Sequence, residues 1–278
     1  MKQIITTSKG NIEYQLEGKG KSVILILNGG HCSSCDSPIP FKQLLINQGF
    51  QLLIPSRPGY GRTPSSTGKI SEQFTDAIVE LLDSLHIKKV IVIAISAGGR
   101  TALQLGGRHP KRVEKIILQG ALTHNQWPDT RTRFGAYIIF NPVIEKSFWA
   151  FFRLMLRKYP LGTLKVMMRG LTNLPVNEVL EKMNKEQINK TIEFLGKLQS
   201  GSGFLNDIQH RSGDLSRIQA PTLIIHSQHD GGNPISHANY AAKHIPNAEL
   251  FITEAESHLI WFSHHNDKIE QKIIEFLQ

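Results

Sequence analysis

The chain has 278 residues, of which 40% are apolar and 23 are glycine, and its formal net charge is +9. This composition excludes a disordered chain and a collagen-like chain, and two cysteines are too few for a small disulfide scaffold. No run of about 20 uncharged apolar residues predicts a membrane-spanning helix. The N-terminal MKQIITTSKG lacks the apolar stretch of a signal peptide, so we expect a cytoplasmic location.

Short apolar runs alternate with segments of helical spacing along much of the chain. We expect an antiparallel hairpin over residues 4–17, then strands at Val23–Leu27, Gln51–Ile54, Val90–Ile95, Val113–Leu118, Thr222–His226 and Glu249–Thr253. Runs that are apolar throughout are typical of parallel strands buried on both faces. Helices are predicted at Phe41–Gln48, Glu72–Leu85, Gly98–Arg108, Ser236–Ile245 and Asn266–Leu277. The alternation predicts an α/β fold with a doubly wound, mostly parallel sheet.

The alternation stops between about residues 121 and 218. Helix-like pieces fill this stretch, at Pro142–Leu156, Leu161–Arg169, Val176–Met183 and Glu186–Gln199. Because strands resume at Thr222, we expect a helical cap over residues 121–218, inserted between two parts of one core, residues 1–120 and 219–278. An independent second domain is the less favoured alternative.

The segment Ala94-Ile95-Ser96-Ala97-Gly98 joins a buried strand to a helix. A serine at such a sharp turn is exposed in a strained conformation, and small neighbours let the strand and helix approach closely. The pattern resembles the G-x-S-x-G nucleophile elbow of the α/β-hydrolase superfamily, with Ala94 in place of the first glycine. The resemblance implies that Ser96 is a nucleophile. The alternative is an ordinary helix N-cap.

In that superfamily an acid and a histidine follow the serine, each in a loop after a later strand. Asp230 follows the strand at 222–226 and His258 follows the strand at 249–253. The resemblance therefore implies a triad in which Asp230 orients His258 and His258 takes the proton of Ser96. The alternatives are that Asp230 is only a turn residue and His258 only a surface residue. Competing side chains for the acid or base are Asp129, His229, Glu254, Glu256, His264 and His265.

Two loops after early strands also resemble the superfamily. Asn28-Gly29-Gly30-His31 stands where the family commonly shows H-G-G-P, and both glycines are kept. The resemblance implies an oxyanion hole formed by the backbone N–H groups of Gly30 and Ala97. The loop Ser56–Thr63 resembles the family's D-x-x-G-x-G-x-S segment, with Ser56 in place of the aspartate. We expect this loop to brace the active-site face and assign no chemistry to it.

Cys32 and Cys35 have the C-x-x-C spacing of some zinc and redox sites. A structural zinc site usually needs four ligands, and a thioredoxin-like site needs a different βαβ context. We expect two reduced thiols near the mouth of the active site. No metal and no organic cofactor are predicted.

The positive charge is concentrated between Arg131 and Arg169, where eight Lys and Arg residues stand against Glu145 alone and aromatic residues are interleaved. We favour a cap with an apolar inner face over the substrate and a solvated cationic outer face. Contact of an amphipathic patch with anionic lipid or an acidic partner is the less favoured alternative. No recognition motif accompanies the charge, so nucleic acid is not an expected partner.

Together with the resemblance, these residues predict a carboxylesterase-like serine hydrolase. Its expected substrate is a small or medium ester-like molecule with an apolar portion (a carboxylic ester, lactone or acylglycerol), cleaved through an acyl-enzyme on Ser96. Serine in place of aspartate argues against the dehalogenase and epoxide-hydrolase branches. Two alternatives stay open: a ligand-sensing or partner-binding protein of the same fold with slow or no turnover, and a degenerate hydrolase fold without activity.

Overall fold

The computed structural model describes residues 2–34, 41–126, 130–141 and 143–278. One eight-stranded sheet runs through it, with the strands in the order β1-β2-β4-β3-β5-β6-β7-β8. β1 and β2 form the predicted hairpin, β2 pairs antiparallel with β4, and the other pairings are parallel. The strands are β1 Lys2–Thr7, β2 Gly10–Glu17, β3 Ser22–Leu27, β4 Phe50–Pro55, β5 Val90–Ile95, β6 Val113–Gln119, β7 Thr222–Ser227 and β8 Ala248–Thr253.

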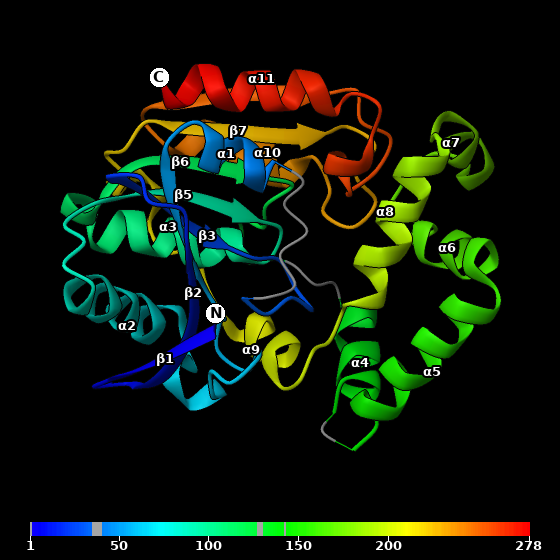
Figure 1. Ribbon diagram of the computed structural model, residues 1–278, viewed down its shortest axis with the longest axis horizontal. Coiled ribbons are helices and arrows are strands. Elements are labelled where there is room, and N and C mark those ends of the chain that lie inside the picture. The colour runs from blue at the N-terminus through cyan, green and yellow to red at the C-terminus, as the bar shows by residue number, and fades with distance from the viewer. Residues whose placement is uncertain (1, 35–40, 127–129, 142) are drawn as a thin grey trace.

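Helices cover both faces of the sheet (Figure 1). Alternate side chains of a strand point to opposite faces, so a strand that is apolar throughout needs cover on both. α1 and α11 pack on one face, and α2, α3 and α10 pack on the other. These helices are α1 Lys42–Asn47, α2 Ser71–Ser84, α3 Gly98–Arg108, α10 Ser236–His244 and α11 Asn266–Leu277. The predicted doubly wound, mostly parallel α/β sheet is confirmed.

β8 is a strand, as predicted, but it is not buried on both faces. It is the last strand of the sheet, and Glu249, Leu250 and Ile252 are exposed. The residue types of β8 match those of the central strands, but an edge strand receives only partial cover. Its apolar sequence therefore predicted the strand correctly and its burial wrongly.

Between β6 and β7 the described chain is helical. α5 to α8 form a group beyond the carboxyl ends of the parallel strands (Figure 1). α4 and α9 have no counterpart among the predicted helices. None of the described helices is both long and apolar enough to cross a bilayer. The helices of this segment are α4 Thr130–Ile139, α5 Glu145–Lys158, α6 Pro160–Met168, α7 Val176–Lys182, α8 Lys185–Gly196 and α9 Gly203–Gln209.

Candidate active site

Ser96 lies at the turn between β5 and α3, with a backbone φ of +49°. A non-glycine residue in this region is uncommon and persists only where its surroundings fix the backbone. The Ser96 N–H donates to the Gln119 carbonyl at 3.0 Å, and the Ser96 carbonyl accepts from the N–H groups of Gly99 and Leu122 at 3.0 and 2.9 Å. The strained turn is therefore held by the neighbouring strand and by the loop that follows it.

Small residues are needed around Ser96 because neighbouring parts of the chain approach it closely. A Cβ on Gly98 would overlap the carbonyl oxygen of Leu27 at the end of β3, and a Cβ on Gly99 would lie 2.7 Å from that of Ala121. Ala94, the departure from the family pattern, is fully buried on the sheet face that packs against α2 and α3. The extra methyl group at this position is thus accommodated within the core, whereas one at Gly98 is not.

Asp230 and His258 lie side by side in the loops after β7 and β8. His258 Nδ1 is 2.7 Å from Asp230 Oδ2, and the backbone N–H groups of Gly232 and Asn233 donate to Asp230 Oδ1 at 2.9 and 2.7 Å. A carboxylate accepts at this distance, so the network assigns the proton to Nδ1 and leaves His258 Nε2 as an acceptor. Asp230 is thus a turn residue, as in the alternative interpretation, and also the partner of His258.

Charge and burial act in opposite directions on His258. Burial alone would lower the pKa of the imidazole, but the Asp230 carboxylate and its hydrogen bond raise the pKa above its ordinary value. A second histidine, His226, has Nε2 3.5 Å from Asp230 Oδ2 and 2.9 Å from the Asn233 carbonyl oxygen. Burial is the largest cause of the lowered pKa of His226. The buried carboxylate thus favours the imidazolium form of His258.

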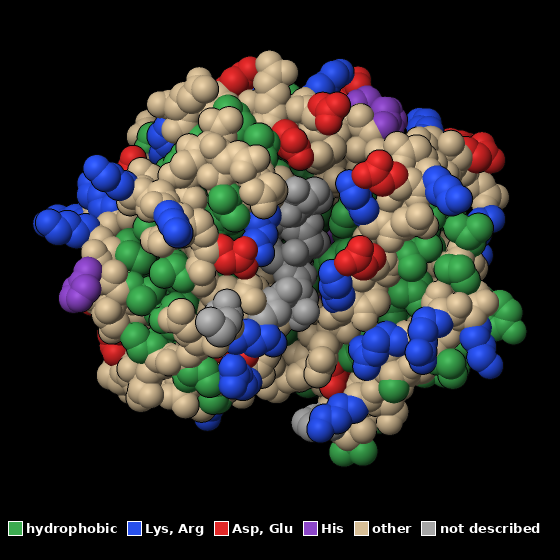
Figure 2. Space-filling model, in the orientation of Figure 1, with side chains coloured by type: hydrophobic (Ala, Val, Ile, Leu, Met, Phe, Trp, Pro, Cys, Tyr) green, Lys and Arg blue, Asp and Glu red, His purple; other side chains and the backbone are tan. Residues whose placement is uncertain are grey.

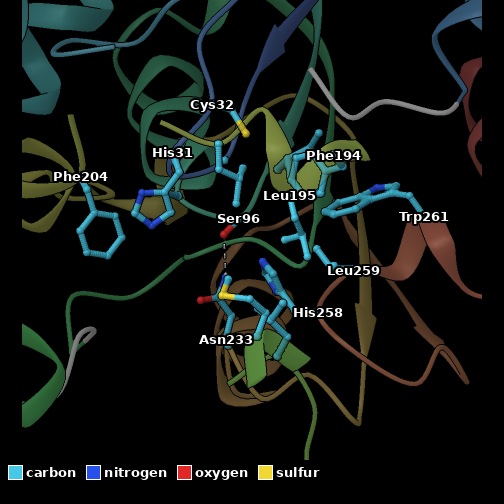
Figure 3. Close-up of a pocket in the computed structure, with 18 residues that line it drawn as sticks. His31, Cys32, Ser96, Phe194, Leu195, Phe204, Asn233, His258, Leu259 and Trp261 are labelled. Atoms are coloured by element: carbon cyan, nitrogen blue, oxygen red, sulfur yellow. Dashed lines mark hydrogen bonds between the residues drawn. The ribbon is translucent and has the colours of Figure 1, made fainter. Parts of the chain in front are cut away.

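Ser96 and His258 face the same pocket, and Asn233 lies beside them (Figure 3). The Asn233 amide donates to Ser96 Oγ at 3.3 Å and to the Gly120 carbonyl at 2.6 Å. Within the described residues, Ser96 Oγ makes this hydrogen bond and none to His258. Sequence reasoning missed Asn233, although it stands only three residues after Asp230 in the same turn.

The amides of Gly30 and Ala97 also border this pocket. Among the described residues, neither N–H group has a hydrogen-bond acceptor, and both are thus available to a ligand. Gly29 of the same loop lies close to Ser96: a Cβ on it would approach that of Ser96 to 3.1 Å. The structure therefore brings together Ser96, Asp230, His258 and the two predicted donors.

The Ser56–Thr63 loop braces the glycine loop through Arg57. The buried guanidinium donates to the carbonyls of Asn28 and Gly29 at 2.8 and 3.0 Å. It also forms a buried ion pair with Asp207 of α9. Tyr60 donates to the same carboxylate at 2.6 Å, and burial followed by the Asp207 charge raises the pKa of Tyr60. This network was not predicted, because its carboxylate, Asp207, lies in the inserted segment, 150 residues after Arg57.

The inserted segment also contacts the loops that carry Asp230 and His258. The carbonyl of Leu171, just after α6, accepts from the N–H groups of His258 at 2.7 Å and Gly231 at 3.2 Å. The Thr172 hydroxyl donates to the Glu256 carbonyl, and the Asn173 N–H donates to that of His229 at 3.0 Å. The loop after α6 therefore holds the backbone on which Asp230 and His258 are mounted.

The pocket has a volume of about 210 Å³. Among the described residues that line it, the ionisable side chains other than Cys32 are two histidines, His31 and His258, and no Lys, Arg, Asp or Glu is present. Its walls come from the core and from the inserted segment. The core contributes Ile95, Leu259 and Trp261, and the inserted segment contributes Met167, Leu171, Phe194, Leu195, Leu198 and Phe204. The site can therefore enclose a small neutral molecule against an apolar wall.

His31 completes the pocket opposite Trp261 (Figure 3). Its ring stacks on Phe204 at 4.4 Å between centroids, and its Nδ1 lies 2.6 Å from Ser200 Oγ. Burial lowers the pKa of His31 to about 4, so the ring is neutral at physiological pH. Sequence reasoning did not assign His31 to the site, because this residue was considered as a departure from the family's proline and as a poor third ligand beside the two cysteines.

The remaining predicted candidates lie elsewhere. Cys32 is buried and lines the pocket, whereas Cys35 and Asp129 lie outside the described residues. His229, Glu254, Glu256, His264 and His265 do not line the pocket. Donor atoms of Glu256, His264 and His265 lie within 4.8 Å of one another and are the described group that could hold a metal ion. Glu256 is already engaged by His264 Nδ1 at 2.7 Å and by the Ser263 hydroxyl at 2.7 Å.

Comparisons with known proteins identify the family of this chain. The chain is 35% identical to the uncharacterized hydrolase YcgS of Bacillus subtilis (strain 168), over 99% of this chain and 98% of the relative. It is 23% identical to the 2-hydroxy-6-oxononadienedioate/2-hydroxy-6-oxononatrienedioate hydrolase 1 of Pseudomonas putida, over 96% and 92% of the two chains. A solved alpha/beta hydrolase fold protein from Nakamurella multipartita superposes with a TM-score of 0.85 at 22% identity, covering 100% of this chain and 99% of the other. The family model for the alpha/beta hydrolase fold matches residues 23–264, and the chain belongs to this family of hydrolases.

Proposed function

We propose that this hydrolase is a serine hydrolase acting on a small or medium ester-like substrate. One observation carries the proposal: Ser96, on a strained turn at the carboxyl end of β5, borders the same apolar pocket as His258, whose Nδ1 is held by the buried Asp230 carboxylate. This arrangement supports the assignment of Ser96, His258 and Asp230 as a Ser-His-Asp triad.

In the first step His258 Nε2 takes the Ser96 proton while Oγ attacks the acyl carbonyl carbon. Asp230 holds the imidazole tautomer and stabilises the imidazolium that forms. The Gly30 and Ala97 amides receive the oxyanion of the tetrahedral intermediate, and loss of one such donor typically costs about a hundredfold or more in rate. The imidazolium then protonates the leaving alkoxide. Water, activated by the same histidine, releases the acid from Ser96.

The apolar lining of the pocket favours some substrate classes over others. A carboxylate buried here without a cationic partner would carry a large desolvation penalty. The dienedioate named for the Pseudomonas putida relative carries two carboxylates, and no Lys or Arg lines the described pocket to receive them. We therefore favour a neutral ester, lactone or acylglycerol. Its apolar portion would lie against Met167, Leu195 and Phe204, which come from residues 121–218, the proposed cap.

The test is labelling with a fluorophosphonate probe, followed by peptide mass spectrometry. We expect label on the peptide that contains Ser96, lost in Ser96→Ala and strongly slowed in His258→Ala. Ser84→Ala, at the exposed end of α2, is the matched control and should label like the wild type. Absence of label on folded wild-type protein would contradict the proposal and favour a ligand-sensing or inactive member of the fold.

A further inference from the structure

The exposed apolar side chains of this protein are concentrated on the inserted helices. Ten of the fifteen large hydrophobic side chains that are exposed among the described residues lie between Phe134 and Val166. Phe151 is 62% exposed, Tyr159 62% and Val166 63%. Scattered exposed hydrophobic residues are normal, but such a concentration on one region marks an interaction surface.

α5 and α6 enclose an apolar groove within this region. It has a volume of about 480 Å³ and is lined by Phe148, Phe151, Phe152, Met155, Tyr159 and Val166, together with Gly162, Thr163 and Met167. We call the exposed side of α5 and α6, residues 145–169, the docking face. Hydrophobic and basic side chains gather over these helices in Figure 2.

The cations of the docking face have no partners of opposite charge. Lys146, Arg153, Arg157, Lys158, Lys165 and Arg169 lie on these residues, and none of them is within ion-pair distance of a carboxylate in the described part of the chain. The single acid of the segment, Glu145, is buried and accepts from the N–H groups of Ser200 and Gly201 at 2.9 Å. Its charge therefore faces inward.

The neighbouring helix α8 shows the contrast. Its Lys190 pairs with Glu186 at 2.7 Å, and its Lys197 pairs with Glu193 at 2.6 Å. A face that is merely solvated carries such mixed charge, with i,i+4 pairs of opposite sign. The docking face instead combines exposed aromatic and aliphatic side chains with cations of one sign.

We propose that the docking face binds the surface of an anionic lipid bilayer, with α5 and α6 lying in the interfacial plane. Interfacial helices have this composition: apolar and aromatic side chains enter the headgroup region while Lys and Arg contact anionic headgroups. A second copy of the chain is a poorer occupant, because it would bring six cations against six. The inference goes beyond the proposed function and holds whether or not Ser96 is catalytic.

The position of the groove gives this docking a consequence for substrate entry. Met167 lines both the groove and the pocket that contains Ser96. The bilayer would thus cover a wall of the catalytic pocket. Met167 is therefore the side chain through which a substrate dissolved in the membrane would be expected to reach the pocket that contains Ser96.

The experiment is co-sedimentation of the full chain with vesicles of phosphatidylglycerol or of phosphatidylcholine alone, at low and high salt. It is run with Ser96→Ala as well as wild type, so that binding is read independently of hydrolysis. We expect binding to phosphatidylglycerol only, weakened by salt. Arg157→Gln with Lys158→Gln should lower the affinity by about fivefold per cation. The matched control is Lys88→Gln with Lys89→Gln, which removes two adjacent exposed cations just before β5, outside the docking face. This variant should bind like wild type.

A second variant separates the apolar contribution. Phe151→Ser with Val166→Ser keeps every charge and should lower the affinity at least tenfold. Equal binding to both lipids, equal loss in the two charge variants, or no binding by folded wild type would overturn the proposal. A dimer in gel filtration that Phe151→Ser dissociates would assign the docking face to a second copy instead, and would also overturn it.

Discussion

The Asn233 side-chain amide donates to Ser96 Oγ at 3.3 Å while it donates to the Gly120 carbonyl at 2.6 Å. The serine oxygen therefore acts as an acceptor in this structure, and its own proton is left for another group. His258 Nε2 is the acceptor that the proposed mechanism requires. Asn233 is a positioning residue in this scheme, because it fixes the serine rotamer without exchanging a proton.

Replacing Asn233 with leucine removes both hydrogen bonds at similar volume. We expect kcat to fall by about ten- to hundredfold with little change in KM, since a misplaced nucleophile slows the chemical step rather than binding. Steady-state kinetics on a chromogenic ester measures this effect. Asn239→Leu, on the exposed side of α10, is the control. Unchanged kcat in Asn233→Leu would exclude the positioning role.

Replacing Asp230 with asparagine removes the charge that holds His258. kcat should fall by about 10⁴-fold, because the wrong imidazole tautomer is favoured. The pH profile supplies an independent readout. Asp230 raises the pKa of His258, so in the variant the remaining activity should persist to lower pH than in the wild type. Measurement of kcat/KM between about pH 5 and 9 tests this; an acidic limb at the same pH in both proteins would contradict it.

Breaking the ion pair between Arg57 and Asp207 should destabilise the fold, because the remaining charge is buried without its partner. Arg57→Met is expected to lower the free energy of unfolding by about 3–5 kcal/mol, measured by urea denaturation. Arg57→Met with Asp207→Leu removes both charges and should recover part of that loss. A double variant that is no more stable than Arg57→Met would mean that the carbonyl contacts of Arg57, rather than its ion pair, dominate.

Two one-methyl changes around Ser96 should have very different effects. In Gly98→Ala the new Cβ overlaps the Leu27 carbonyl oxygen and crowds the backbone before Gly29, so both the elbow and the glycine loop must shift. We expect loss of fluorophosphonate labelling. Ala94→Gly restores the family pattern and should keep labelling, with a stability loss of about 1 kcal/mol. Equal labelling rates in the two variants would show that the contact at Gly98 is not needed for reactivity.

Buried neutral histidines should make the fold sensitive to acid. Burial, together with the charges of His124 and Arg100, lowers the pKa of His237 to about 3. The unfolded chain takes up this proton near pH 6.5, so the free energy of unfolding should fall as the pH drops from there toward 3. His237→Gln keeps an acceptor for the Thr123 N–H, which now donates to Nδ1 at 3.0 Å.

In His237→Gln the slope of stability against pH should decrease, by at most about 1.4 kcal/mol per pH unit. Urea denaturation at a series of pH values measures the slope. His244→Gln, exposed at the end of the same helix, should leave the slope of the wild type unchanged. The same slope in His237→Gln would mean that His237 does not contribute.

The sequence predicted the features that depend on local pattern. β5 and α3 were read from continuous apolar and helical spacing, and the positions of Asp230 and His258 were read from the strands that precede them. Asp207 and Asn233 were missed because their roles depend on contacts with distant segments. An acid in α9 carries no local sign that it will meet Arg57, 150 residues earlier. Likewise, no local pattern distinguishes the edge strand β8 from a central strand.

The carbonyl oxygen of Leu171 accepts from the backbone of both the Asp230 loop and the His258 loop. The inserted segment thus supports the loops that carry Asp230 and His258, and we expect a version of the chain trimmed to its sheet and flanking helices to lose the geometry of the proposed triad. A movement that carried Leu171 away would break its hydrogen bonds to the backbones of Gly231 and His258. We therefore expect substrate and product to exchange by movements that leave these hydrogen bonds in place, such as rotation of side chains in the pocket wall.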